Sequence, residues 1–276
     1  MGSLFSLFSA PRIAADWDPD VPAIAASGLG MKGSRPVFED VGAHVPTGGL
    51  LVITGPEGSG KTSLLLALAG RMRVDAGSAQ IYGVDLRRSA RTVRGLVSIG
   101  HVSGLTDFDN NLRVRQLVAE RLIMLQPWYK PWVSKKRVNE VLERLARIYH
   151  EVQGAYSAVA GSDPSPFPTG AYADELTDLE QFLLAAALAS LARSPVLALD
   201  NIDLLRRRED RECAWLALLV VRNIFESPQV GQPTLIVTCE THEELDEVLA
   251  DRVALDHAHV ADPASEIVHL GLRPRS

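Results

Sequence analysis

Residues 50–63 read Leu-Leu-Val-Ile-Thr-Gly-Pro-Glu-Gly-Ser-Gly-Lys-Thr-Ser, and this stretch decides the fold. The apolar run 50–54 is bounded by glycines, which is typical of a buried strand. A helical pattern follows from Lys61 to Ala69 and stops at Gly70. The residues between satisfy G-x-x-x-x-G-K-[ST] in the strand, loop and helix context that this phosphate-binding motif requires. The stretch therefore predicts an α/β P-loop core.

The residue types of this loop predict its chemistry. Glycines let backbone N–H groups approach phosphate oxygens at a helix N-terminus, whose dipole favours an anion. Lys61 can reach the β- and γ-phosphates, and the Thr62 hydroxyl can be a ligand of Mg²⁺. We therefore predict that a nucleotide with Mg²⁺ binds here, to Gly55, Pro56, Glu57, Gly58, Ser59, Gly60, Lys61, Thr62 and Ser63.

A P-loop needs a second residue to hold the metal, normally a carboxylate at the end of an adjacent apolar strand. Asp200 closes the apolar run 195–199 and is the predicted partner of Thr62. A second strand pattern at 234–238 is separated from the first by the helix-like segment 211–225, which is the alternation of a parallel α/β sheet.

The remaining patterns divide the chain into parts. Residues 1–20 form a polar N-terminal tail, and residues 21–276 form one domain. The domain starts with two short strands around the turn 32–35. Residues 105–192 are mostly helical in pattern, interrupted by a Pro/Gly/Ser-rich loop at 161–170, and indicate an inserted helical subdomain.

Composition excludes several classes of protein. A chain of 276 residues with 46% hydrophobic and 22% charged residues is expected to fold around a sizeable core. The net charge of −6 and the lack of a long basic run argue against a nucleic-acid-binding protein. The most apolar run, 182–192, is about half of the roughly 20 residues that span a bilayer. Two cysteines outside any Cys-x-x-Cys spacing favour a reducing compartment.

Residues 22–270 resemble the nucleotide-binding domains of ATP-binding-cassette (ABC) transporters. The resemblance rests on the order of a β lead-in, the loop 55–62, the segment 75–83, the helical insert, the strand ending at Asp200 and the segment 249–253. It implies an ABC-type P-loop NTPase core with a small N-terminal β subdomain and an inserted α-helical subdomain. It also implies that Lys61 holds phosphate while Thr62 and Asp200 hold Mg²⁺.

The signature of that family, Leu-Ser-Gly-Gly-Gln, aligns with residues 176–180, which read Leu-Thr-Asp-Leu-Glu. The glycines that approach the partner subunit's nucleotide would be Asp178, a carboxylate facing phosphate, and Leu179, a side chain where backbone contact is needed. Two interpretations remain open: a capping box that opens a helix, or a surviving phosphate contact through Thr177.

Other departures fall at residues that the family uses for hydrolysis. Asn201 stands where a glutamate polarises the attacking water, and Glu240 stands where a histidine contacts the γ-phosphate. Ser103 or Gly104 replaces a glutamine, and the adenine-stacking aromatic near Lys32 is missing, with Phe38 only a weak substitute. An amide can orient water but cannot accept its proton, so we expect binding without fast turnover.

The resemblance implies an ATP-binding subunit on the cytoplasmic face of a membrane. Its expected partners are a separately encoded, permease-like integral membrane protein and a second nucleotide-binding domain, in a homodimer or heterodimer. Two alternatives stay open: a soluble nucleotide-sensing interaction module without a transport role, and an active ATPase that uses Glu240 as the general base.

Two further patterns have weaker interpretations. His257 and His259 could share a strand face and bind a metal, but two ligands without a third favour a plain polar surface. Residues 128–132 read Trp-Tyr-Lys-Pro-Trp and precede the cations at 135–137. Aromatic and basic side chains together suit an interface beside a bilayer, and ordinary surface packing is the alternative.

Overall fold

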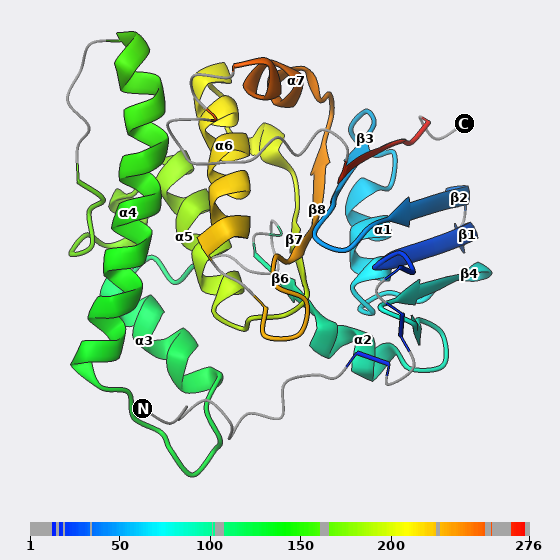
Figure 1. Ribbon diagram of the computed structural model, residues 1–276, viewed down its shortest axis with the longest axis horizontal. Helices are drawn as coiled ribbons and strands as arrows, with labels where there is room; N and C mark the ends of the chain where they lie inside the picture. The colour runs from blue at the N-terminus through cyan, green and yellow to red at the C-terminus, as the bar shows by residue number, and fades with distance from the viewer. Residues whose placement is uncertain are drawn as a thin grey trace.

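A computed structural model of the chain describes residues 13–14, 17–18, 20–33, 35–100, 102, 108–160, 166–224, 227–251, 255 and 266–273 (Figure 1). The first strands, β1 (Ile24–Lys32) and β2 (Pro36–Val45), pair antiparallel on either side of the predicted turn. With β4 (Ala76–Ile81) and β5 (Val84–Asp85) they form a four-stranded sheet in the order β2-β1-β4-β5. This confirms the predicted β lead-in.

The second sheet has the order β6-β7-β8-β3-β9, and its neighbouring strands all pair parallel. The predicted phosphate-loop strand is β3 (Leu50–Thr54), and it lies between β8 (Thr234–Cys239) and β9 (Ile267–Gly271). The other strands are β6 (Val97–Ile99) and β7 (Val196–Leu199). Because parallel strands end at the same edge of a sheet, the ends of β3, β7 and β8 lie together.

Helices cover both faces of the parallel sheet (Figure 1). On the side of the antiparallel sheet lie α1 (Lys61–Leu68) and α2 (Ala90–Leu96). The opposite side carries α3 (Val114–Met124), α4 (Lys135–Ala160), α5 (Asp178–Ser190), α6 (Arg208–Ile224) and α7 (Glu243–Ala250). Two 3₁₀ turns, Ala173–Glu175 and Ile202–Leu204, precede α5 and follow β7.

The alternation of side chains along β3 explains why the whole strand is apolar. Leu50 and Val52 pack into the core beneath the helices α3–α7, whereas Leu51 and Ile53 pack into the core beneath α1 and the antiparallel sheet. A strand that is buried on both faces has no polar side to show in its sequence. The rigid centre of the sheet therefore holds the loop that follows Thr54.

Most predicted elements are present with small changes at their ends. The helix α1 ends one residue earlier than predicted, and the following Gly70 adopts a left-handed φ of 70°. The helix α6 begins at Arg208, three residues before the predicted start. The segment 105–192 contains α3, α4 and α5, as its pattern indicates, while its independence as a subdomain stays a prediction.

Both cysteines are free and buried, and burial raises the pKa of each thiol to about 12. Among the helices in the described ranges, none combines the length and the apolar character needed to cross a bilayer.

Candidate functional site

The loop after β3 is shaped by glycines that no other residue could replace without strain. Gly58 and Gly60 adopt positive φ angles of 76° and 96°. A Cβ on Gly60 would lie 2.5 Å from the Val37 carbonyl oxygen, whereas a Cβ on Gly58 would meet no atom within 4 Å. Gly60 is therefore required both because a side chain would clash there and because its φ is positive. Gly58 borders open space, where a ligand can approach.

Lys61 starts α1 and is only 9% exposed. Its Nζ donates hydrogen bonds to the carbonyl oxygens of Gly55 at 2.6 Å and Pro56 at 3.1 Å. The Ser59 N–H also donates to the Pro56 carbonyl oxygen, at 3.1 Å, and closes the turn. The ammonium group is thus held inside the loop, beside the backbone N–H groups that the sequence predicts to bind phosphate.

The two predicted metal ligands lie in direct contact, although 138 residues separate them in the chain. The Thr62 hydroxyl donates to the Asp200 carboxylate at 2.8 Å from Oδ2 and 3.1 Å from Oδ1. Asp200 follows β7 and is 3% exposed. A hydroxyl and a carboxylate oxygen are ligands that Mg²⁺ prefers.

A third residue at this position, Thr238, was missed by the sequence analysis. Its side chain is fully buried in β8. Its hydroxyl donates to Asp200 Oδ1 at 2.6 Å and accepts the Asn201 N–H at 2.7 Å. Thr238 therefore orients the predicted metal ligand and satisfies the backbone of the next residue. A threonine in an apolar strand gives no sequence signal for this role, because only the pairing of β7 with β8 brings it to Asp200.

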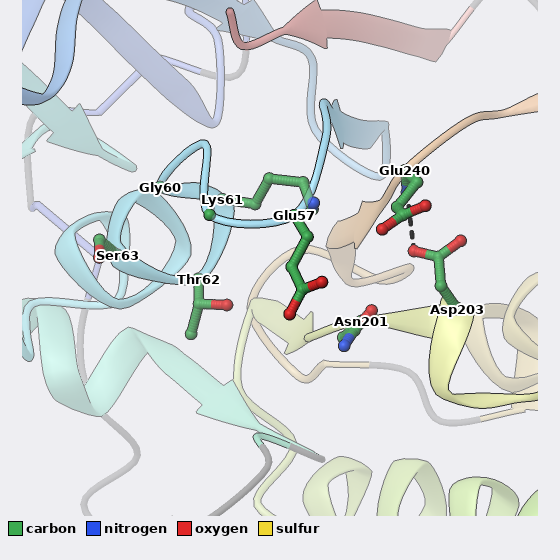
Figure 2. A pocket seen from close by; sticks show the side chains of 9 residues that line it. Glu57, Gly60, Lys61, Thr62, Ser63, Asn201, Asp203 and Glu240 are labelled. Carbon is green, nitrogen blue, oxygen red and sulfur yellow. Dashed lines mark hydrogen bonds between the residues drawn. The ribbon is translucent and has the colours of Figure 1, made fainter. Parts of the chain in front are cut away.

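A pocket of about 460 Å³ opens next to the loop (Figure 2). Six of the nine predicted loop residues line it. The full lining set is Glu57, Gly58, Gly60, Lys61, Thr62, Ser63, Asn201, Asp203 and Glu240. The predicted residues Gly55, Pro56 and Ser59 are not in this set and instead shape the loop. Asn201 and Glu240, the predicted catalytic candidates, both line the pocket with Lys61.

The wall made by Asn201, Asp203 and Glu240 is acidic, and Asp203 was not predicted. The Glu240 N–H donates to Asp203 Oδ2 at 2.7 Å, as Figure 2 shows. Burial raises the pKa of the Asp203 carboxyl above its usual value, and the negative charge of Glu240 adds to this, against the opposing effect of the hydrogen bond. Asp203 could have been predicted as a site residue only from its position, because it is a polar residue shortly after the end of an apolar strand.

The segment 176–180 forms a capping box at the start of α5, which is one of the two interpretations left open. The Thr177 hydroxyl accepts the Glu180 N–H at 3.3 Å, and Glu180 Oε2 accepts the Thr177 N–H at 2.8 Å. The same Thr177 hydroxyl donates to Glu180 Oε2 at 3.0 Å. Both hydrogen-bonding functions of Thr177 are thus used within its own chain.

The two residues aligned with the signature glycines differ in burial. The Leu179 side chain is 8% exposed and packs into the core beneath α5. Asp178 is exposed. A helix buries one face, and Leu179 lies on the buried face of α5.

Phe38 is also not available as an adenine platform, because it is 5% exposed and belongs to the core beneath the antiparallel sheet. The predicted substitution at Ser103 or Gly104 lies outside the described residues, as do His257 and His259. In the part of the chain that the structure describes, no three His, Cys, Asp or Glu side chains form a group suited to hold a metal.

The donor set at the loop fits a magnesium nucleotide. Lys61 and the glycine backbone supply positive charge and N–H donors, and Thr62 with Asp200 supplies oxygen ligands. The family model described as "ABC transporter" matches residues 38–202, which is more than half of the chain. The chain belongs to the ABC transporter family. The matched ABC region contains the phosphate loop, the helical segment, residues 176–180 and Asp200.

Two curated relatives in the ABC family match different shares of the chain. The cytochrome c biogenesis ATP-binding export protein CcmA of Alkalilimnicola ehrlichii is 42% identical over 86 residues, 30% of this chain and 36% of that protein. The sulfate/thiosulfate import ATP-binding protein CysA of Mycolicibacterium paratuberculosis is 33% identical over 215 residues, 76% of this chain and 50% of that protein. The chain thus spans between about a third and a half of these curated relatives.

Solved ABC structures share the fold. The dimeric structure of MJ0796, a bacterial ABC transporter cassette, matches with a TM-score of 0.58 at 14% identity, over 90% of this chain and 94% of that chain. The structure of cbiO1 from Clostridium perfringens, part of the ABC transporter complex cbiONQ, matches with a TM-score of 0.59 at 12% identity, over 83% and 82%. The predicted fold, an ABC-type P-loop core with an N-terminal β subdomain, is confirmed.

Proposed function

We propose that this chain is the ATP-binding subunit of an ABC-type transporter or membrane complex and that it binds Mg-ATP without fast turnover. The observation that carries the proposal is that Lys61 and Thr62 line one pocket and that the Thr62 hydroxyl contacts the Asp200 carboxylate. A separately encoded, permease-like membrane protein and a second nucleotide-binding domain are the proposed partners. The proposed location is the cytoplasmic face of a membrane.

Each residue has a role that its geometry supports. The glycine loop and Lys61 bind and orient phosphate oxygens, and Lys61 is already held at the pocket by Gly55 and Pro56. Thr62 and Asp200 hold the Mg²⁺, and Thr238 fixes the Asp200 carboxylate. Bound Mg²⁺ supplies positive charge that offsets the phosphates. If the ATP-bound subunit binds one conformation of its partner more tightly than another, ATP binding shifts the partner toward that conformation.

At the position where the family places a general base, this chain has an amide side chain, which cannot take a proton from water. Asn201 occupies that position at the end of β7 and lines the pocket. In a head-to-tail dimer, pairing with an identical copy leaves both sites without the glutamate and without the signature glycines. Pairing with an intact homologue leaves one site without the glutamate and the other without the glycines, so neither arrangement restores a complete site.

We therefore expect a turnover below about 1 s⁻¹, the low end of ordinary enzyme rates. The measurement is release of inorganic phosphate from ATP by the purified full chain, with the Lys61→Met variant as the background control. Turnover at or above that rate that disappears in the variant would show an active ATPase. In that case Glu240→Gln decides whether Glu240 is the base, because loss of turnover in Glu240→Gln would favour that alternative.

The soluble sensing module remains the alternative from another functional class. Purification in mild detergent from the native host separates the two, because an integral membrane protein in the same complex supports the transporter subunit. A stable complex with a soluble protein alone, binding nucleotide in the same sample, would support the sensing module.

Glu240 also gives a prediction for nucleotide selectivity. Its carboxylate and that of Asp203 line the same pocket as Lys61, so their negative charge is expected to disfavour the third phosphate of ATP more than the two phosphates of ADP. A unit charge about 6 Å away in a largely solvated site, with an effective dielectric constant of about 40–80, is worth roughly 0.7–1.4 kcal/mol. Glu240→Gln is therefore expected to raise Mg-ATP affinity about 3- to 10-fold and to change Mg-ADP affinity less than about 2-fold.

Isothermal titration calorimetry with both nucleotides measures this selectivity. The matched control is Glu243→Gln, which removes another exposed carboxylate from the start of α7 outside the pocket lining. An equal gain for ATP and ADP in Glu240→Gln, or the same gain in Glu243→Gln, would contradict a specific effect on the terminal phosphate.

A further inference from the structure

The connection between α3 and α4 carries the most exposed aromatic side chains among the described residues. Trp128 is 92% exposed, Trp132 68%, and Tyr129 52%, and the neighbouring Met124 is 66% exposed. In Figure 1 this connection lies at one end of the helical layer, away from β3 and α1, which hold the phosphate loop. We call residues 124–137 the aromatic turn. The nucleotide pocket uses none of its residues.

The aromatic turn is held in a defined conformation, so its exposure is a property of the fold. The Lys130 N–H donates to the Pro127 carbonyl oxygen at 2.8 Å and closes a turn with Trp128 and Tyr129 at its tip. Their rings meet edge to face at 6.1 Å between centroids. Val133 packs against the core and anchors the far side. The chain therefore presents large apolar surfaces to the outside on an ordered support, which favours a partner surface that covers them.

The charge of the aromatic turn is opposite to that of the protein. Residues 121–139 contain no Asp or Glu, whereas the whole chain has a net charge of −6. The cations of the turn are Lys130, Lys135, Lys136 and Arg137, and the last three are exposed. The exposed aromatic side chains are therefore accompanied along the chain by a stretch of positive charge, bordered by the exposed Glu120 and Glu140, on an acidic protein.

The basic residues at the start of α4 do not stabilise this helix. Lys135, Lys136 and Arg137 form its first turn, which holds no acidic residue. The helix dipole disfavours cations at this end, so α4 would be more stable with carboxylates in their place. Ser134 caps the helix by accepting the Arg137 N–H at 3.3 Å. The N-terminal end of α4 adds its own partial positive charge to that of the side chains.

We propose that the aromatic turn binds the surface of an anionic lipid bilayer. Trp128, Tyr129 and Trp132 would lie in the headgroup region, where aromatic rings with a polar edge are favoured. Lys130, Lys135 and Lys136 would contact the anionic headgroups, with their carbon stems along the apolar surface. This combination of tryptophan and lysine fits a lipid interface better than an apolar protein surface, which would leave the cations without partners. The inference goes beyond the proposed function and does not depend on nucleotide.

Vesicle sedimentation with the full chain tests the proposal. Binding to phosphatidylcholine vesicles with about 30% phosphatidylglycerol is expected to exceed binding to pure phosphatidylcholine at least about 10-fold. The variants Trp128→Ala/Trp132→Ala and Lys135→Glu/Lys136→Glu are each expected to reduce binding about 10-fold. The matched control is Arg87→Glu/Arg88→Glu, which changes the net charge equally at two exposed residues between β5 and α2 and is expected to retain binding.

Tryptophan fluorescence gives a second readout of the same contact. The four tryptophans are Trp17, Trp128, Trp132 and Trp215, and Trp215 is fully buried. Brominated lipids are expected to quench the wild-type emission and to leave that of Trp128→Ala/Trp132→Ala unchanged. Thermal unfolding of each variant checks that the fold is retained.

Equal losses in the lysine and arginine pairs would overturn the proposal, because overall charge would then account for binding. Absence of binding to both kinds of vesicle would also overturn it, and capture of an integral membrane protein that depends on Trp128 and Trp132 would then assign the turn to a protein partner. Nucleotide titration on the same samples separates these results from a failure of the proposed function, since a defective phosphate site leaves the lipid readouts unaffected.

Discussion

Lys61→Met is expected to weaken Mg-ATP binding about 100-fold while leaving the fold intact. Lys61 is 9% exposed and its ammonium group is held at the pocket by two carbonyl oxygens, so it is expected to meet phosphate oxygens with little solvent between them. A hydrogen bond to a charged group contributes about 1.5–3 kcal/mol, and contacts to two phosphates correspond to roughly two orders of magnitude in affinity. Methionine keeps the length and the apolar stem of the side chain.

Calorimetric titration with Mg-ATP measures this loss, and circular dichroism checks the fold. Lys136→Met is the matched control, because it removes an exposed lysine from α4 outside the pocket lining. Similar affinities for the wild type and Lys61→Met would contradict the proposal that the loop after β3 is the nucleotide site.

Thr238→Val is expected to lower both the free energy of unfolding and the affinity for Mg²⁺. The substitution leaves the partly buried Asn201 N–H without its acceptor and removes a donor to the buried Asp200 Oδ1. An unsatisfied buried group costs about 1–3 kcal/mol, so we expect a destabilisation of about 2 kcal/mol. Residues that orient a metal ligand typically contribute 10- to 100-fold to metal affinity. We therefore expect the affinity for Mg²⁺, measured from the Mg²⁺ concentration that ATP binding requires, to fall about 10-fold.

Thr234 in the same strand is a close control. It is also fully buried, and its hydroxyl accepts the Gly48 N–H at 3.1 Å and pairs with the Tyr82 hydroxyl at 2.9 Å. Thr234→Val therefore loses two buried hydrogen bonds at the opposite end of β8 from Asp200. Urea unfolding is expected to show similar destabilisation in both variants, and a Mg²⁺ effect in Thr238→Val alone. Equal Mg²⁺ effects in both would show that Thr238 acts only through stability.

The sequence predicted the phosphate loop, but it did not predict the role of Thr238. The residues 50–63 form a local unit, because strand, loop and helix follow each other directly and the geometry of the loop depends on glycines within it. Such a unit can be predicted from its own residues. Asp200 could be predicted because an apolar strand ends at it, and Asn201 and Glu240 followed from their distances to elements of the family.

Only the tertiary structure shows that Asp203 belongs to the acidic wall of the pocket and which side chains of residues 176–180 are buried. Asp203 reaches the pocket through a 3₁₀ turn and a hydrogen bond from Glu240, which is 37 residues away. The burial of Leu179 depends on which face of α5 meets the core, and the alignment with the signature did not predict it. Phe38 was likewise removed from the site by packing under the antiparallel sheet.

The chain's residue order was therefore sufficient to predict the P-loop core and the contact between the proposed metal ligands, because glycine conformations, strand burial and helix capping are local. The pairing of β7 with β8 and the burial of side chains depend on contacts between distant segments. Those contacts alone place Thr238 on Asp200, Asp203 beside Glu240, and the aromatic turn on the outside of the helical layer. Long-range packing selects which polar and aromatic side chains reach the site or the surface, and no local pattern carries that information.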